Sequence, residues 1–339
     1  MENAAVGIFL TLTGGVIGSS TLMPVKYVRV WKWENTWLAY SSFAYFIFPW
    51  LSALLTVPHL ISVYAGVEGK TLFLTAVFGL GWGLGVVLYG LALDIVGLSI
   101  SSGIILGSSV ALGSLIPLLL IGTELALSSY GIRILSADAV MIAGVLLCAW
   151  AGSLRQKGIA VAESENRGAR FLSGILICFL GGMLSPLLNV AFTFGAPITR
   201  RALDLGATPF NASNGVWALC VSAGSLPSIF YCLFKLKKNH SWSFYSLPHS
   251  RKNLVLCFAM GVFFIASTIL YGAAAGKLGF LGPVVGWPIY ISALILGNNF
   301  WGWYTDEWKS VKGLPVWTMY AGITLQVVAM VLLGIAKKS

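Results

Sequence analysis

The stretch Phe78–Gly107, FGLGWGLGVVLYGLALDIVGLSISSGIILG, decides the fold class, because its 30 residues include a single charged side chain, Asp94. A helix on the surface of a soluble protein needs a polar face towards water, and this stretch has none. An apolar run of about 20 residues crosses the hydrocarbon core of a bilayer as a helix. The stretch therefore predicts two membrane crossings that meet near Asp94.

The rest of the chain has the same character, with 58% hydrophobic and 9% charged residues among its 339. Soluble domains are nearer 45–50% apolar and about 25% charged. The composition predicts an all-α polytopic membrane protein and excludes a soluble enzyme or a nucleic-acid-binding protein. About ten transmembrane helices are expected, at 4–24, 36–57, 71–93, 98–121, 136–154, 171–199, 210–234, 253–275, 279–300 and 314–335.

The positive charges predict how these helices are oriented. Loops that follow odd-numbered apolar runs carry twice as many Lys and Arg residues as the rest of the chain. Cytoplasmic loops of membrane proteins are enriched in these residues. We expect the odd-numbered loops to be cytoplasmic and both termini to be periplasmic. The net charge of +10 then reflects orientation and contact with membrane lipid, not a nucleic-acid partner.

The two halves of the chain repeat each other. Residues that recur at offsets of 167 or 182 include the pairs Gly7/Gly174, Gly14/Gly181, Gly15/Gly182, Gly79/Gly261, Tyr89/Tyr271 and Gly90/Gly272. We expect a five-helix repeat at 1–160, a second at 170–339, and a cytoplasmic connecting loop at 155–170. Because five is an odd number, the second repeat is inverted. Inverted repeats are typical of alternating-access transporters, whose site lies near the middle of the membrane.

We expect all eleven acidic residues and all three histidines to lie at the ends of these runs or in loops. Intramembrane catalysis or a metal site needs such groups at depth, so neither an enzyme nor a metal or organic cofactor is expected. A neutral substrate is favoured for the same reason. Sugar hydroxyls pair with Asn, Ser and Tyr, and sugar C–H faces pack on aromatic rings. The candidate substrate-binding residues are Trp82, Tyr89, Asn189, Asn214, Trp217, Trp287, Tyr290 and Ser292, although each could also serve helix packing alone.

The segments MPVKYVRVWKWENTW, residues 23–37, and Phe78–Gly107 resemble the L-rhamnose–proton symporter family of the drug/metabolite transporter superfamily. Matches continue through LDLGATP, residues 203–209, to Trp287, Ser292 and Trp308. The resemblance implies a ten-helix bundle that imports a deoxy-hexose with a proton across the bacterial inner membrane. It also implies that the fifth and tenth helices lie outside the transport core, where they often form a homodimer. Three positions depart from the family pattern, in which Asn, Lys and His stand at Val86, Ala196 and Tyr290.

Proton symport requires a group that changes its protonation during transport. Glu34 is the first candidate, since it lies in the family motif and Lys26, Arg29 and Lys32 are close enough in sequence to exchange partners with it. Asp94 is a weaker candidate. Sodium coupling and simple facilitated diffusion remain alternatives for the energetics, and export of a drug or metabolite remains an alternative for the function.

Overall fold

The computed structural model describes residues 2–96, 98–159, 167–306, 308–309 and 311–335, and every regular element within them is a helix. In this described part, nine helical segments are long and apolar enough to cross a membrane. The chain is therefore an all-α multi-pass membrane protein. These segments are Ala4–Tyr27, Trp33–Thr56, Gly69–Ala92, Gly103–Ile121, Ser129–Arg155, Leu172–Asp204, Asn214–Lys238, Ser250–Leu278 and Leu314–Ile335.

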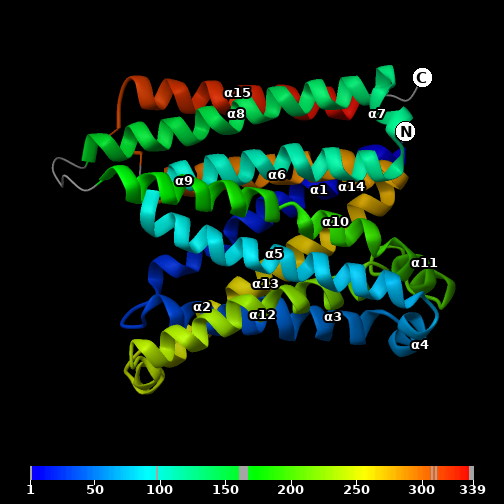
Figure 1. Ribbon diagram of the computed structural model, residues 1–339, viewed down its shortest axis with the longest axis horizontal. Helices are drawn as coiled ribbons and strands as arrows, with labels where there is room; N and C mark the ends of the chain where they lie inside the picture. Colours follow the sequence, from blue (N-terminus) through cyan, green and yellow to red (C-terminus); the bar gives the residue numbers. More distant parts are fainter. Residues whose placement is uncertain (1, 97, 160–166, 307, 310, 336–339) are drawn as a thin grey trace.

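The helices lie roughly along the long axis of the molecule (Figure 1). The first half comprises α1 (Glu2–Ser19), η1 (Ser20–Tyr27), α2 (Trp33–Ser41), η2 (Ser42–Ile47), α3 (Phe48–Thr56), α4 (Leu60–Ala65), α5 (Gly69–Val96), α6 (Leu98–Ile121), α7 (Thr123–Leu127) and α8 (Ser129–Ile159). The second half comprises α9 (Arg167–Leu184), α10 (Leu187–Phe194), α11 (Ala196–Asp204), α12 (Asn214–Lys238), η3 (Trp242–Ser246), α13 (Ser250–Leu278), η4 (Gly279–Leu281), α14 (Gly282–Tyr304) and α15 (Leu314–Ile335).

The ninth expected helix forms as α14 but does not belong to the nine apolar segments. Its two prolines, its tryptophans and the pair Asn298-Asn299 make it more polar than the others. Most of its residues are nevertheless buried, because α14 lies between α1, α6 and α13. The sixth expected helix is broken into α9, α10 and α11, with one break at Ser185-Pro186. Proline lacks the N–H that a continuous helix requires at this point.

The fifth expected helix begins earlier than residue 136, because α8 starts at Ser129. The Ser128 hydroxyl accepts a hydrogen bond from the Gly131 N–H at 3.1 Å, and so caps the helix. Asp138 consequently lies well inside α8, and it is only 3% exposed. The expectation that every acidic residue lies at a helix end or in a loop is wrong at this position.

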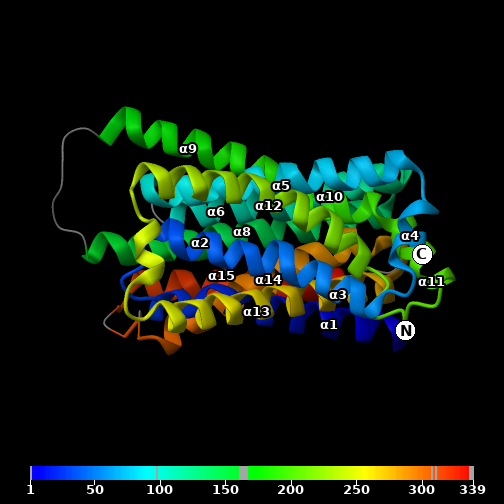
Figure 2. The same cartoon turned by 90° about the horizontal axis from the view of Figure 1, so that it is seen from below.

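The two ends of the bundle differ in the segments they carry. The start of α1, the end of α15 and the short helices α4, α7 and α11 lie at one end, which we call the terminal end (Figures 1 and 2). The last turns of α8 and the loops that follow η1, α12 and α14 lie at the other end. These are the loops rich in Lys and Arg, and we call this end the basic end.

Glycines allow the central helices to approach one another closely. On α5, a Cβ atom at Gly79 or Gly83 would overlap the α12 backbone at Cys220 or Gly224. Helix α5 also packs on α9 and α10, and α1 packs on α13 and α14. Helices α8 and α15 pack on each other as an outer layer at the top of Figure 1. The central helices α1, α5, α6, α12, α13 and α14 thus surround the middle of the bundle.

Candidate functional site

Two adjoining cavities lie between the central helices. The central cavity has a volume of about 230 Å³ and is lined by residues of α1, η1, α2, η2, α5, α6, α13 and α14, among others. The second cavity, which we call the vestibule, has a volume of about 290 Å³. Both are lined by Ser19, Leu22, Tyr89, Leu106 and Asn298. Because they share these residues the two cavities adjoin, and the vestibule is the one nearer the basic end.

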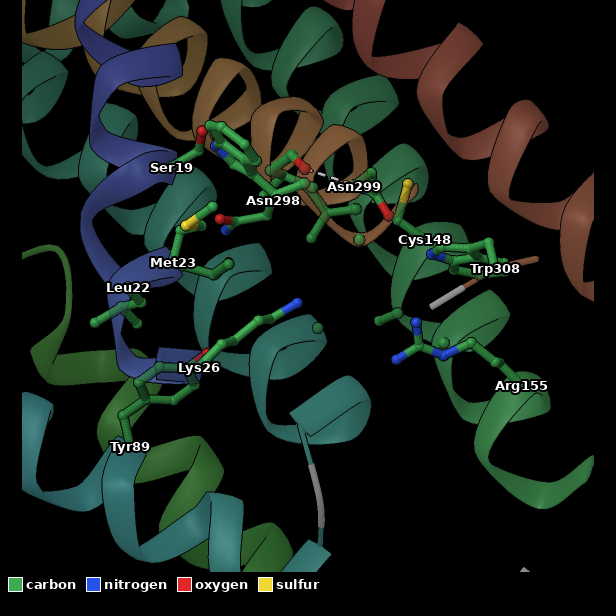
Figure 3. Close-up of a pocket in the computed structure, with 18 residues that line it drawn as sticks. Ser19, Leu22, Met23, Lys26, Tyr89, Cys148, Arg155, Asn298, Asn299 and Trp308 are labelled. Carbon is green, nitrogen blue, oxygen red and sulfur yellow. Dashed lines mark hydrogen bonds between the residues drawn. The ribbon is translucent and has the colours of Figure 1, made fainter. Parts of the chain in front are cut away.

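Two cations lie in the vestibule. Lys26 of η1 and Arg155 of α8 extend into it from opposite sides (Figure 3). The Lys26 Nζ donates a hydrogen bond of 2.7 Å to the Thr305 hydroxyl, and the Arg155 guanidinium lies 5.0 Å from the Trp308 ring centre. The vestibule is therefore cationic near the basic end.

Aromatic rings form one side of the central cavity. We call Trp37, Tyr40, Tyr45, Trp82 and Phe264 the aromatic wall, and all five line the cavity. The Tyr45 ring packs edge-on against Trp82 and Phe264, with centroids 5.2 and 4.9 Å away. Tyr45 lies in η2, a single π-helical segment, and such segments change the register of a helix and often occur at functional sites. The wall offers flat apolar faces to a ligand.

The polar groups of the central cavity are few and neutral. Besides the tyrosines and tryptophans, they are the side chains of Ser19, Thr21, Ser185 and Asn298. The Thr21 hydroxyl is buried and has no hydrogen-bond partner within the described structure. None of the described residues that line this cavity is charged. The cavity thus suits a small neutral molecule with both an apolar face and hydrogen-bonding groups.

Four of the eight candidate substrate-binding residues line the central cavity: Trp82, Tyr89, Trp287 and Tyr290. The Trp287 indole N–H donates to the Ser109 carbonyl at 3.1 Å, which fixes the ring. The Tyr290 hydroxyl lies 2.7 Å from the Ser267 hydroxyl, within hydrogen-bonding distance. These two bonds hold both α14 rings at the cavity surface.

Asn189, Asn214, Trp217 and Ser292 do not line either cavity. Asn189, on α10, is fully buried and joins three other helices. Its amide donates to the carbonyls of Gly113 on α6 and Pro283 on α14, at 2.8 and 2.9 Å. Its oxygen accepts a bond of 2.6 Å from the Tyr271 hydroxyl on α13. We call this group the Asn189 clamp.

Aromatic side chains beside the Asn189 clamp occupy the space between the central cavity and the terminal end. The Phe192 and Trp217 rings stack with centroids 4.7 Å apart, and Tyr271 lies 5.6 Å from both Phe192 and Trp287. Asn214 donates to the Thr56 hydroxyl at 2.8 Å. Asn189, Asn214 and Trp217 are therefore placed at contacts between helices, whereas Ser292 is buried on α14 with a hydroxyl that has no hydrogen-bond partner in the described structure.

The candidate coupling residues lie apart from the central cavity or outside the described side chains. Glu34 is 4% exposed and accepts hydrogen bonds from the Asn239 amide at 2.8 Å and the Ser241 hydroxyl at 2.7 Å. Its hydrogen-bond partners are thus neutral groups of the loop after α12, whereas Lys26 lies in the vestibule. Asp94 is in α5, and its side chain lies outside the described part.

Several cavity residues were not identified from the sequence. Tyr40 and Tyr45 line the cavity because of the π-helical register of η2, which hydrophobic periodicity does not reveal. Asn298 could have been identified, because the pair Asn298-Asn299 is polar and lies within an apolar run, which indicates a polar cavity or contact. Thr21 gave no signal of this kind.

The chain resembles transport proteins of one kind over its whole length. The family model of the L-rhamnose-proton symport protein matches residues 1–339. An L-rhamnose-proton symporter of Citrobacter koseri is 24% identical over 347 aligned positions that cover 100% of both chains. One from Cronobacter sakazakii is 25% identical with 99% of both chains covered, and one from Salmonella gallinarum is 24% identical with full coverage. This chain belongs to the L-rhamnose-proton symport protein family, which is a family of transporters and not of enzymes.

Proposed function

We propose that this protein imports L-rhamnose, or a related deoxy-hexose, together with a proton and by alternating access. The relatives that carry the name L-rhamnose-proton symporter support this proposal over the full length of the chain. The observation that carries it is the central cavity, which is uncharged in its described lining, walled by aromatic rings and joined to the vestibule. This cavity gives no support to the alternative of a carrier for organic cations, which would need a compensating acid.

The lining of the cavity suits a sugar that carries few hydroxyl groups. A deoxy-hexose presents a C–H face and a methyl group that can pack on the aromatic wall, while Thr21 and Asn298 can bond its hydroxyls. Val86 and Tyr290, where the sequence departs from the family pattern, both line the cavity. We therefore include close relatives of rhamnose in the substrate class.

We further propose ten transmembrane helices in two inverted repeats. Related glycines make related contacts, which supports this arrangement. Gly14 on α1 faces Ser267 and Leu270 of α13, and its counterpart Gly181 on α9 faces Leu88 of α5. Gly15 then faces α14, as Gly182 faces α6. In this arrangement α14 is the ninth crossing, despite its polar residues.

The basic end is proposed to face the cytoplasm of a bacterium, with the protein in the inner membrane and both termini in the periplasm. The positive charges of that end support this orientation. The cavity that leads towards the basic end then corresponds to an inward-facing state. A homodimer through α8 and α15 is a further proposal, supported by their outer position and by the exposed ring of Trp317, 71% accessible.

The proposal is tested by uptake of radiolabelled sugars into proteoliposomes that contain the purified protein. We expect L-rhamnose to accumulate when the outside is made acidic, and D-glucose, which has an additional hydroxyl, to accumulate less. Replacing external potassium with sodium at constant pH separates sodium coupling from proton coupling. Equilibration without accumulation would identify a uniporter, and stabilisation by amphipathic drugs but not by sugars would identify an exporter.

A further inference from the structure

Asp138 is an acid buried inside a membrane-spanning helix. It lies nine residues after the start of α8, about 13 Å from the terminal end of that helix at 1.5 Å per residue. It is 3% exposed, and neither oxygen of its carboxyl group has a hydrogen-bond partner within the described structure. Ionisable side chains inside the membrane are costly and commonly mark ion or proton pathways. A function must therefore be sought for this carboxyl group.

The packing of α8 against the antiparallel helix α6 places Asp138 beside Ser114. Along this contact, Gly103 lies opposite Ala149 and Gly107 lies opposite Val145. Seven residues further along α6 and seven residues back along α8 bring Ser114 opposite Asp138. This register makes Ser114 the polar α6 side chain beside the Asp138 carboxyl, although the two groups do not meet the criteria of a hydrogen bond in the described structure.

Ser114 connects this position to α14. Its hydroxyl donates a hydrogen bond of 2.9 Å to the Val284 carbonyl. That carbonyl is available because Pro288, four residues later, has no N–H to bond it. The serine has one hydroxyl hydrogen, which this bond uses, so its oxygen can only accept a hydrogen bond from the other side.

This arrangement suits the neutral form of Asp138 and opposes the ionised form. A protonated carboxyl can donate to the Ser114 oxygen and complete a chain of hydrogen bonds from α8 through α6 to α14. A carboxylate has no hydrogen to donate to the Ser114 oxygen. It also receives none from Ser114, because the hydroxyl hydrogen is already donated to the Val284 carbonyl. A buried charge without a partner strongly destabilises the packing around it.

In the described structure, no ionisable group on the helices packed against α8 pairs with the Asp138 carboxyl. Helix α6 has no ionisable side chain in its sequence. Helix α14 has Tyr290, which pairs with Ser267, and Tyr304, which is exposed; α15 has the exposed Tyr320. Glu124 of α7 and Arg133 of α8 are exposed.

We propose that Asp138 binds the coupling proton and that its neutral form is needed for α6, α8 and α14 to pack together at the terminal end. The carboxylate takes a proton from water when these helices separate there. Val145 and Gly152 follow Asp138 at seven-residue steps on the same face of α8, and both line the vestibule. The α6–α8 contact therefore gives the route by which the proton is released to water at the basic end. Val284, whose carbonyl ends this chain of hydrogen bonds, lies three residues before Trp287 on α14. Because Trp287 lines the central cavity, this position links the proton site to that cavity.

This inference deepens the proposed proton symport and differs from the hypothesis that Glu34 carries the proton. Glu34 already accepts two hydrogen bonds as a carboxylate, so its present surroundings suit the ionised form. The carboxyl of Asp138 has no such donors. Substitution of each acid by its amide therefore separates the two sites.

The first experiment compares Asp138→Asn with Glu34→Gln and with Asp306→Asn, a control at an exposed acid that pairs with Lys309. Asparagine resembles a protonated aspartic acid in shape and charge. We expect Asp138→Asn to retain rhamnose exchange across proteoliposomes at equal pH and to lose accumulation driven by a pH gradient. Both control variants should keep both activities. Accumulation by Asp138→Asn at the wild-type level, or loss of exchange as well as accumulation in a folded variant, would overturn the proposal.

A second experiment needs no sugar. A cysteine in place of the buried Ser213 at the terminal end reports opening there through its reaction with a maleimide, and the five native cysteines are buried. Because a maleimide reacts with the thiolate, whose fraction itself rises with pH, each rate is divided by the rate for the same cysteine in Asp138→Asn at the same pH. We expect this ratio to rise with pH, since the carboxyl changes from mostly protonated to mostly ionised within about two pH units. The corresponding ratio for Asp138→Glu should also rise with pH, with a shifted midpoint.

The labelling result also separates the two proposals. A pH dependence that requires Asp138, in a protein that does not accumulate rhamnose, would retain the proton site and reject the proposed sugar. A ratio of the wild-type labelling rate to the Asp138→Asn rate that does not vary with pH would reject Asp138 as the proton site even if rhamnose is transported.

Discussion

The Asn189 clamp provides a test of how the terminal end is closed. Asn189→Ala removes two hydrogen bonds to the Gly113 and Pro283 carbonyls and one from the Tyr271 hydroxyl. These bonds join α10 to α6, α14 and α13. Because Asn189 lies away from both cavities, we expect the variant to alter opening at the terminal end and not contacts with the sugar.

The size of the effect follows from the number of bonds. Hydrogen bonds between membrane helices contribute about 0.6 kcal/mol each on average. Loss of three such bonds should destabilise the closed arrangement by about 2 kcal/mol, which corresponds to about a thirtyfold change in the equilibrium constant. Tyr271→Phe removes only one of the three and should change the equilibrium about threefold.

The assay is the rate at which a maleimide labels the cysteine introduced by Ser213→Cys, measured at constant pH. Asn299→Ala is a matched control, because the Asn299 amide donates within its own helix, to the Ile295 carbonyl at 3.0 Å. We expect labelling to accelerate strongly in Asn189→Ala, weakly in Tyr271→Phe and not in Asn299→Ala. Unchanged labelling with a tenfold or larger loss of sugar affinity in Asn189→Ala would refute this reasoning and return Asn189 to the substrate site.

Three further variants test other parts of the structure. Trp287→Ala should weaken sugar binding by about tenfold in calorimetry, as expected for loss of one stacked ring, while Trp287→Phe should retain most of the affinity. Gly83→Ala should prevent the close contact of α5 with α12 and lower the melting temperature sharply, whereas Gly69→Ala, at an open position, should leave it unchanged. Glu34→Gln keeps an oxygen that can accept from Asn239 and Ser241, so the melting temperature should change little; a large decrease would show that the negative charge itself holds that loop.

The sequence predicts the fold well because the long apolar runs are its strongest signal, and because the membrane strongly limits which structures such runs can form. Backbone groups inside a membrane must be bonded within the chain, so long apolar runs form helices. The exceptions are places where a side chain alters a helix locally. Ser128 extends α8 at its start by capping it, and Ser185-Pro186 divides the sixth expected helix, although neither residue changes the hydropathy of its run.

The candidate site was only partly predictable, since residue type indicates chemistry but not direction. Trp287 and Asn189 are equally plausible as sugar ligands in the sequence, yet Trp287 lines the cavity and Asn189 bonds to three other helices. The sequence predicts that Asp138 lies at a helix end, because the fifth apolar run is expected to start at residue 136. The burial of this acid depends on where α8 starts, and local composition does not determine that.

Two prolines explain why hydrogen bonds between helices occur on the side of the central cavity nearer the terminal end. Pro117 on α6 leaves the Gly113 carbonyl without a helical partner, and Pro288 on α14 does the same for Val284. Each carbonyl instead accepts a bond from another helix, from Asn189 in one case and from Ser114 in the other. Because these bonds join separate helices, they can break when the helices separate without disrupting either helix. The prolines of α6 and α14 therefore make the closure of these helices depend on a few side chains, of which Ser114 is the one that lies beside an acid.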